Sequence, residues 1–333
     1  MRVVVIGGTG FVGRAIVADL ETAGHAVLVV HRGNREPDTG APVSDHAHLD
    51  RHDVPALRAA IAQFGADALV DDMAMTAADA DEALSAAPAS LRLLVLSSMD
   101  VYRAFASLHA GTESDAMPLD EQSPVRPERY PYRGKIVKMD DYEKLDVEER
   151  YCARGGTAIR LPMIYGEHDP QRREEPILRR LRAGRTQLPI GAANWLWTRG
   201  YVGELARGIR LALESEQARG EVFNLGEART PTMRAWIEQV IAAAGGTLEL
   251  VPVDERRLPP DLGLTAAIRQ HLVVDSAKAR ALIGWVHADP AAGVERSVRW
   301  HLAHPPAEPD ADFSADDRAL AARVDGDDGA EPA

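Results

Sequence analysis

Proton chemistry in this sequence would rest on a phenol and an amine that lie close together in one charged stretch. Tyr142 and Lys144 stand two residues apart in DDYEKLDVEE, residues 140–149. A positive charge beside a phenol favours phenolate, so such a pair is suited to general acid–base catalysis. In a helix, however, positions two apart point about 200° away from each other. Which residue carries the proton is therefore an open question.

A glycine-rich segment near the N-terminus, GGTGFVG at residues 7–13, carries a second kind of chemistry. It follows an apolar strand pattern at 2–7 and opens a helical pattern at 11–24. Gly7 would permit a tight turn, Gly10 a close approach of a pyrophosphate, and Gly13 close packing of helix on strand. The first N–H groups of the helix would face the phosphates. The segment predicts a dinucleotide site.

The end of the next strand, expected at 25–30, bears on which dinucleotide binds. NAD-binding sites of this type usually carry an acidic residue there for the ribose 2′-hydroxyl. Here His31 and Arg32 follow the strand. No carboxylate would repel a 2′-phosphate, and a guanidinium can pair with one. The sequence favours NADP, with NAD as the alternative.

The elements that must position these residues alternate between strands and helices. Strand patterns occupy 2–7, 25–30, 67–75, 91–98, 157–166 and 221–226, and helical patterns occupy 11–24, 54–65, 136–153 and 232–245. This alternation predicts an α/β fold: a Rossmann-type, doubly wound parallel sheet with a smaller C-terminal substrate lobe. We expect the cofactor domain at 1–166 plus about 197–227, the substrate lobe at 167–196 and 228–304, and a disordered acidic tail at 305–333.

Composition excludes several functions. The chain has 333 residues and a net charge of −13, which argues against nucleic-acid and anionic-membrane partners. With one cysteine, Cys152, and no signal-peptide or membrane-span pattern, we expect a cytoplasmic protein. His46, His48 and His52 lie close together without a metal-binding motif, and we predict no metal. A homodimer is compatible with the sequence, which does not determine the oligomeric state.

Several motifs together resemble the extended short-chain dehydrogenase/reductase superfamily, including its atypical members, and specifically the NAD-dependent epimerase/dehydratase family. The motifs are GGTGFVG (7–13), HLDRHD (48–53), DDMAM (71–75), VLSSMDVY (95–102), RLPMIYG (160–166), TRGYVGELARG (198–208), FNLG (223–226) and DSAKARALIGW (275–285). The resemblance covers about residues 1–304.

The resemblance implies a catalytic set of Ser98, Tyr142 and Lys144. Ser98 would polarise the substrate, tyrosine would act as acid/base, and Lys144 would lower the pKa of the tyrosine and hold the nicotinamide ribose. Implied cofactor contacts are Gly7, Thr9, Gly10, Phe11, Val12, Gly13, His31, Arg32, Asp50, Ala74, Lys144 and Pro162, and implied substrate contacts are Asp100 and Arg199.

One position departs from the family pattern Y-x-x-x-K-x-x-x-E. Lys144 and Glu148 fit it, but Asp140 stands where the tyrosine belongs. Four readings stay open: Tyr142 serves because the helix starts late, a tyrosine of the preceding loop (Tyr130 or Tyr132) serves, Asp140 carries the proton, or the helix binds cofactor without much catalysis. A surface-pair role for Lys144 and Glu148 is the plain alternative.

The function expected from the resemblance is that of an NADP-dependent oxidoreductase, epimerase or dehydratase. Its substrate would be a small polyhydroxylated or nucleotide-linked molecule with an alcohol or carbonyl. The alternative is a cofactor-binding regulator or nucleic-acid-associated protein with little turnover.

Overall fold

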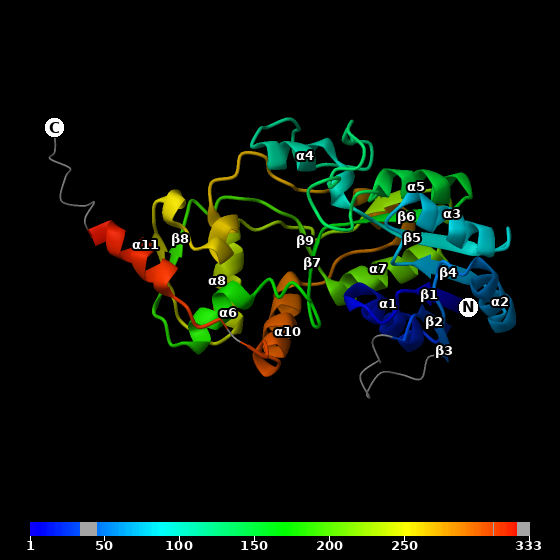
Figure 1. The fold of residues 1–333 in the computed structure, drawn as a ribbon, viewed down its shortest axis with the longest axis horizontal. Coiled ribbons are helices and arrows are strands. Elements are labelled where there is room, and N and C mark those ends of the chain that lie inside the picture. Colours follow the sequence, from blue (N-terminus) through cyan, green and yellow to red (C-terminus); the bar gives the residue numbers. More distant parts are fainter. Residues whose placement is uncertain (34–44, 309, 325–333) are drawn as a thin grey trace.

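The structure is a computed structural model, and it describes residues 1–33, 45–308 and 310–324. A seven-stranded, all-parallel sheet forms one lobe, and a smaller α/β lobe extends from it (Figure 1). In spatial order the strands are β10 (Val222–Asn224), β6 (Thr157–Leu161), β5 (Arg92–Ser98), β4 (Ala68–Asp71), β1 (Arg2–Ile6), β2 (Ala26–His31) and β3 (Asp45–His48). The predicted fold class is confirmed.

Helices cover both faces of the sheet because its strands are apolar on both sides. One face packs against α1 (Phe11–Thr22), α7 (Val202–Glu214) and α9 (Ala277–Ile283). The other packs against α2 (Val54–Phe64), α3 (Ala77–Ala86) and α5 (Lys144–Ala153). Strand order reverses beside β1, which has β2 on one side and β4 on the other. In such sheets, ligands bind outside the carboxyl ends of the strands at this reversal.

The second lobe has its own apolar core, which includes Trp195 and Trp236. Its elements are β8 (Gln187–Ile190), β11 (Glu249–Pro252), α6 (Glu175–Arg182), α8 (Met233–Ala243), α10 (Pro290–Ala303) and α11 (Ser314–Val324). The remaining elements are α4 (Arg103–Ala110), the paired strands β7 (Met163–Tyr165) and β9 (Arg199–Tyr201), and the 3₁₀ turns η1 (Met99–Val101), η2 (Glu216–Ala218), η3 (Glu255–Arg257) and η4 (Pro260–Thr265). Across the described ranges, no helix has the length and apolar character to cross a bilayer.

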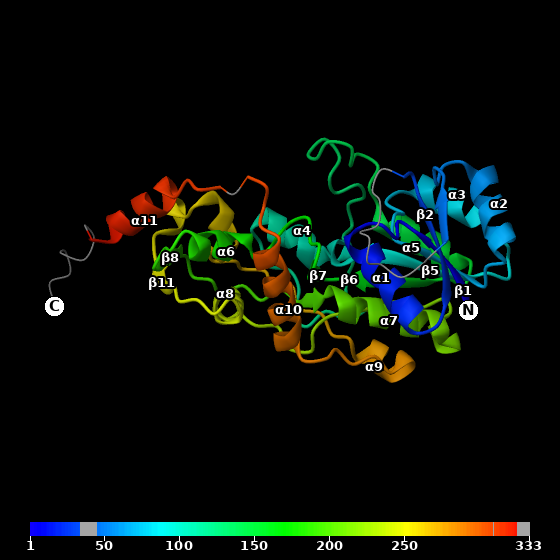
Figure 2. The same ribbon diagram turned by 90° about the horizontal axis from the view of Figure 1, so that it is seen from below.

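Two expectations need correction. The predicted helix over 136–153 begins only at Lys144, because Glu143 caps it by accepting the Leu145 N–H at 3.0 Å. The predicted disordered tail from 305 is wrong for 314–324, which form α11 at the far end of the second lobe (Figure 2). Asp316 is fully buried there and pairs with the buried Arg180 at 2.6 Å. Residues 325–333 lie outside the described part of the chain.

Candidate functional site

The glycine turn after β1 has the shape that a dinucleotide cradle needs. Gly7 has a φ of +92°, in the region that favours glycine. A Cβ added to Gly13 would lie 2.3 Å from the Gly7 carbonyl oxygen, so no side chain fits there. The N–H groups of Phe11 and Val12, the first two of α1, have no acceptor within the helix and can bond a phosphate. The turn thus brings Gly7, Gly10 and Gly13 together as predicted, and this cradle fits a pyrophosphate.

Sequence reasoning missed a carboxyl group beside this turn. Asp72 follows β4 directly, and its carboxyl group accepts the Gly13 N–H. Burial raises the pKa of Asp72 to about 7, while the nearby Lys144 opposes that rise. The position was visible in the sequence, since Asp71 and Asp72 end a strand next to the glycine turn. Only the strand order shows that they lie beside it.

At the end of β2, imidazoles occupy the place of the usual acidic residue. His31 is 8% exposed, and its Nδ1 accepts the Gly33 N–H at 3.2 Å. That contact leaves the proton on Nε2, which lies 2.9 Å from Nδ1 of His46. His48 packs edge-on against His31, with ring centroids 4.6 Å apart. Arg32 is exposed beside this group, and the segment that follows, 34–44, lies outside the described residues.

Lys144 is the first residue of α5 and is almost fully buried. Its ammonium group donates to the carbonyl oxygens of Ala74 at 2.6 Å and Leu96 at 2.9 Å. An ammonium has three N–H donors, so one remains for a ligand. Burial lowers the pKa of Lys144, and the nearby carboxylates, Asp100 first among them, oppose that shift. The plain surface-pair reading of Lys144 is therefore wrong.

Tyr142 reaches the same region because residues before Lys144 are not helical. Its hydroxyl donates to Asp100 Oδ2 at 2.7 Å, and the Lys144 amine lies 6.0 Å from its ring centroid. Tyr132 donates to the same Asp100 oxygen at 2.9 Å. The helical argument that separates Tyr142 from Lys144 does not apply, since the chain turns between them. Sequence spacing alone could not show this.

The proton affinity of Tyr142 differs from what the resemblance implies. Burial raises its pKa well above the ordinary value of a phenol, and the charge of Asp100 and the hydrogen bond to it add to that rise. A hydrogen bond with Ser98 acts the other way but more weakly. Burial and Asp100 thus act against the lowering by lysine that the resemblance implies, and that role of Lys144 stays a prediction.

Ser98 ends β5 and caps η1, with its Oγ accepting the Asp100 N–H at 3.2 Å. Its neighbour Ser97 instead points into the core and donates to Glu148 at 2.5 Å. Glu148 also pairs with Arg160 at 2.8 Å, and both side chains are buried. Glu148 is therefore an internal brace between α5 and β6, and the surface reading is wrong for it as well.

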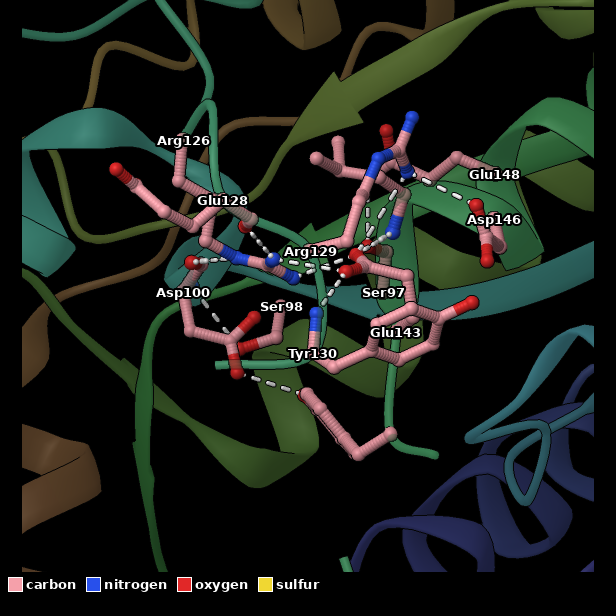
Figure 3. A network of polar contacts seen from close by, with 12 residues as sticks. Ser97, Ser98, Asp100, Arg126, Glu128, Arg129, Tyr130, Glu143, Asp146 and Glu148 are labelled. Atoms are coloured by element: carbon pink, nitrogen blue, oxygen red, sulfur yellow. Dashed lines mark hydrogen bonds and ion pairs between the residues drawn. The ribbon is translucent and has the colours of Figure 1, made fainter. Parts of the chain in front are cut away.

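A buried ion pair holds the loop that carries Tyr132 against α5 (Figure 3). Both guanidinium Nη atoms of Arg126 donate to the Glu143 carboxylate, at 2.8 and 2.6 Å. Glu143 also accepts the Tyr130 N–H at 2.8 Å, and the Arg126 Nε donates to the Asp100 carbonyl at 3.0 Å. Sequence reasoning missed this pair, because the sequence does not indicate which of the many charged residues become buried.

Tyr130 and Asp140, two other proton-carrier candidates, are engaged elsewhere. The Tyr130 ring lies under the Arg133 guanidinium, 4.0 Å from it. Asp140 accepts the Gly134 N–H at 2.8 Å and so supports the loop. The structure therefore brings the hydroxyl groups of Tyr142 and Tyr132 to Asp100. It does not bring Tyr130 or Asp140 there.

The remaining predicted contacts are spread over the structure. Arg199 is fully buried in the second lobe, with its guanidinium 4.5 Å from the Trp236 ring. A substrate phosphate would reach it only if surrounding side chains moved, so its role stays a prediction. Asp50 is exposed after β3, and Pro162 is buried between β6 and β7. Thr9, Phe11 and Val12 lie partly exposed at the glycine turn.

Within the described ranges, His52, Asp79 and Glu82 form a group whose ligand atoms lie within 4.8 Å of one another. His52 already bonds Glu82 at 2.6 Å, and Asp79 caps α3. These contacts account for the cluster without an ion.

Comparisons with known proteins agree with this geometry. The model of the NAD dependent epimerase/dehydratase family matches residues 3–226. No curated protein matches the sequence. Among solved structures, dTDP-glucose 4,6-dehydratase from Bacillus anthracis in complex with NAD superimposes with a TM-score of 0.69 at 16% identity, over 92% of this chain and 97% of that one.

UDP-glucose 4-epimerases give similar values. The enzyme from Thermotoga maritima, solved with UDP-glucose, has a TM-score of 0.66 at 18% identity, over 91% of this chain and 99% of that one. The enzyme from Stenotrophomonas maltophila, with bound NAD, has a TM-score of 0.70 at 18% identity, over 91% and 98%. At these identities the structures establish the shared fold, and the family match carries the assignment. The chain belongs to the NAD dependent epimerase/dehydratase family.

Proposed function

We propose that the protein is a nicotinamide-dependent epimerase or dehydratase that uses Tyr142 as its proton carrier and acts on the alcohol or carbonyl of a nucleotide-linked sugar. One observation carries the proposal: Lys144, with one N–H to spare, stands at the same edge of the sheet as the glycine turn and the Ser98–Tyr142 pair. When bound, the nicotinamide supplies the hydride acceptor and donor.

Each residue has a distinct task in this proposal. The glycine turn with the start of α1 holds the pyrophosphate. Lys144 orients the nicotinamide ribose through its third N–H. Ser98 is partly exposed at the end of β5, so its hydroxyl can bond the substrate oxygen and polarise it. Tyr142 gives a proton to that oxygen or takes one from it.

We propose NADP rather than NAD as the cofactor. His31, held by Gly33 and His46, replaces the acidic residue that would favour a ribose 2′-hydroxyl. The adjacent Arg32 is exposed and free to approach a 2′-phosphate. The two relatives with bound NAD are too distant in sequence to decide this choice.

The substrate class is inferred from the structural relatives, which are named for dTDP-glucose or UDP-glucose. We therefore test the proposal with these two sugar nucleotides. Purified protein is incubated with NADP⁺ and each of them, and the products are separated and identified by NMR. Conversion of at least one is expected, and Tyr142→Phe should slow it at least about 100-fold.

Tyr130→Phe is the matched control, because it removes a phenol hydroxyl from the neighbouring loop without touching Asp100. It should leave turnover within about twofold. Equal turnover of wild type and Tyr142→Phe would remove Tyr142 from the mechanism. Tight cofactor binding without conversion of any sugar nucleotide would instead favour the non-catalytic regulator.

A further inference from the structure

We infer that Asp100 is the final proton acceptor of a relay. Tyr142 passes its proton to Asp100 while it takes one from the substrate, and Tyr132 positions the Asp100 carboxylate by a hydrogen bond. This deepens the proposed function and rests on it, because Tyr142 must be the group next to the substrate. The relay adds Asp100 as proton acceptor and Tyr132 as a positioning residue.

The contacts of Asp100 support this assignment first. It is 4% exposed, and its Oδ2 accepts both phenol hydroxyls, Tyr142 at 2.7 Å and Tyr132 at 2.9 Å. The two phenol rings lie against each other with centroids 5.1 Å apart. Oδ1 is buried, and no other described side chain or backbone group bonds it. The proton of Tyr142 is thus already directed at a buried carboxylate oxygen, Oδ2, which can take it up.

The proton affinity of Tyr142 supplies the reason for a relay. A phenol that is buried beside a carboxylate does not give a stable phenolate at neutral pH, and the pKa of Tyr142 is raised accordingly. A Tyr142 that carries its proton can accept the proton of the substrate only as it gives up its own. Asp100 is the group to which its hydroxyl already donates.

The step balances as follows for oxidation of an alcohol. The substrate O–H bond breaks and its proton joins Tyr142 Oη, while the Tyr142 proton moves to Asp100 Oδ2. The electron pair of the O–H bond forms the second carbon–oxygen bond. The C–H bond of the same carbon breaks, and its hydrogen and electron pair would go to the cofactor as hydride in the proposed reaction. The substrate becomes a carbonyl compound, Tyr142 is unchanged, and Asp100 becomes a carboxylic acid. Reduction runs in reverse.

Four titratable groups face Asp100 and set its charge balance. Tyr132 comes from the loop, Tyr142 from the turn before α5, Arg126 from the start of that loop, and Lys144 from α5. Arg126 and Lys144 attract the carboxylate by charge, and the two phenols donate hydrogen bonds to it. Removing the Tyr132 hydroxyl takes away one of these two neutral donors.

The test follows the carboxyl group directly by infrared spectroscopy of the protein without added cofactor or sugar. The carboxylate stretch of Asp100 is assigned as the band lost in Asp100→Asn. If that variant does not fold, the band must instead move in both Tyr142→Phe and Tyr132→Phe. We expect this band to change frequency in Tyr132→Phe, because one hydrogen bond to the carboxylate is lost, and to stay in place in Tyr130→Phe.

Kinetics give the second readout where a sugar nucleotide is converted. In Tyr132→Phe turnover should fall less than about tenfold, because Tyr132 only positions the carboxylate. Asp100→Asn should lose at least about 100-fold. An unmoved carboxyl band in Tyr132→Phe, or an equal move in Tyr130→Phe, overturns the relay. If no sugar nucleotide is converted, the proposed function fails, and the infrared result still decides whether the phenols control Asp100.

Discussion

The two halves of the candidate site are built in different ways. The glycine turn is a backbone structure, and its shape follows from Gly7 and Gly13, where a Cβ would clash or strain the chain. The relay is made of side chains from three separate segments, which meet only because a buried ion pair holds the loop in place. A backbone site tolerates few substitutions at few positions. A side-chain site depends on the positions of residues that bind nothing themselves.

The largest effect is expected when the buried Arg126–Glu143 ion pair, which supports the side-chain half of the site, is broken. In Glu143→Gln the Arg126 guanidinium loses its charged partner in a buried place, and Glu143 is 0% exposed. Removing one partner of such a pair costs about 3–5 kcal/mol. Urea unfolding should measure this loss in free energy of unfolding. The exposed Arg133–Asp141 pair is the control, and Asp141→Asn should cost no more than about 1 kcal/mol.

The same variant tests a pH dependence. Burial opposes the ionised form of Glu143, but Arg126 and two backbone N–H groups lower its pKa overall. A carboxyl whose pKa is lower in the folded protein stabilises the fold above its unfolded pKa of about 4.3, and that stability is lost as pH falls through the folded pKa. Wild type should therefore lose more stability on acidification than Glu143→Gln. Parallel acid curves for the two proteins would contradict this account.

An effect of intermediate size is expected at the glycine turn, the half of the site that is formed by backbone. In Gly13→Ala the new methyl group meets the Gly7 carbonyl oxygen at 2.3 Å, so the turn must shift. Overpacking of this kind costs about 1–3 kcal/mol, and the shift should also weaken cofactor binding at least tenfold. Calorimetry measures the first effect and cofactor fluorescence the second. Gly263→Ala, where a Cβ meets nothing within 4 Å, should change neither. Unaltered cofactor affinity in Gly13→Ala would place the dinucleotide elsewhere.

The smallest expected effect concerns the preference for NADP over NAD. Arg32→Ala should weaken NADP about tenfold, or about 1.4 kcal/mol, and leave NAD unchanged, because only the 2′-phosphate differs. Arg219→Ala, an exposed arginine paired with Glu216 away from β2, is the control. Equal affinities of wild type for NADP and NAD would refute the proposed preference.

These differences also explain what the sequence could predict. The parallel sheet and the glycine turn follow from local patterns, namely apolar strands and spaced glycines. The motif lysine, Lys144, could be picked out from its spacing to Glu148, but its burial could not. The positions of Asp72, Tyr132 and Arg126 depend on strand order and on which charges become internal, and neither is written in local spacing. The sequence could not show that Tyr142 reaches Asp100, because the eight residues 136–143 were predicted as helix and are not helical.

The late start of α5 has a consequence for altering the protein. Because Lys144 begins the helix, its place against Ala74 and Leu96 is set by α5 and the sheet, independently of the chain before Glu143. We expect that the segment between Arg126 and Glu143 can be varied in length and sequence while Lys144 keeps its place. Under the proposed function, the tyrosines that handle the proton and the lysine that holds the cofactor are then separate parts of one short stretch of chain.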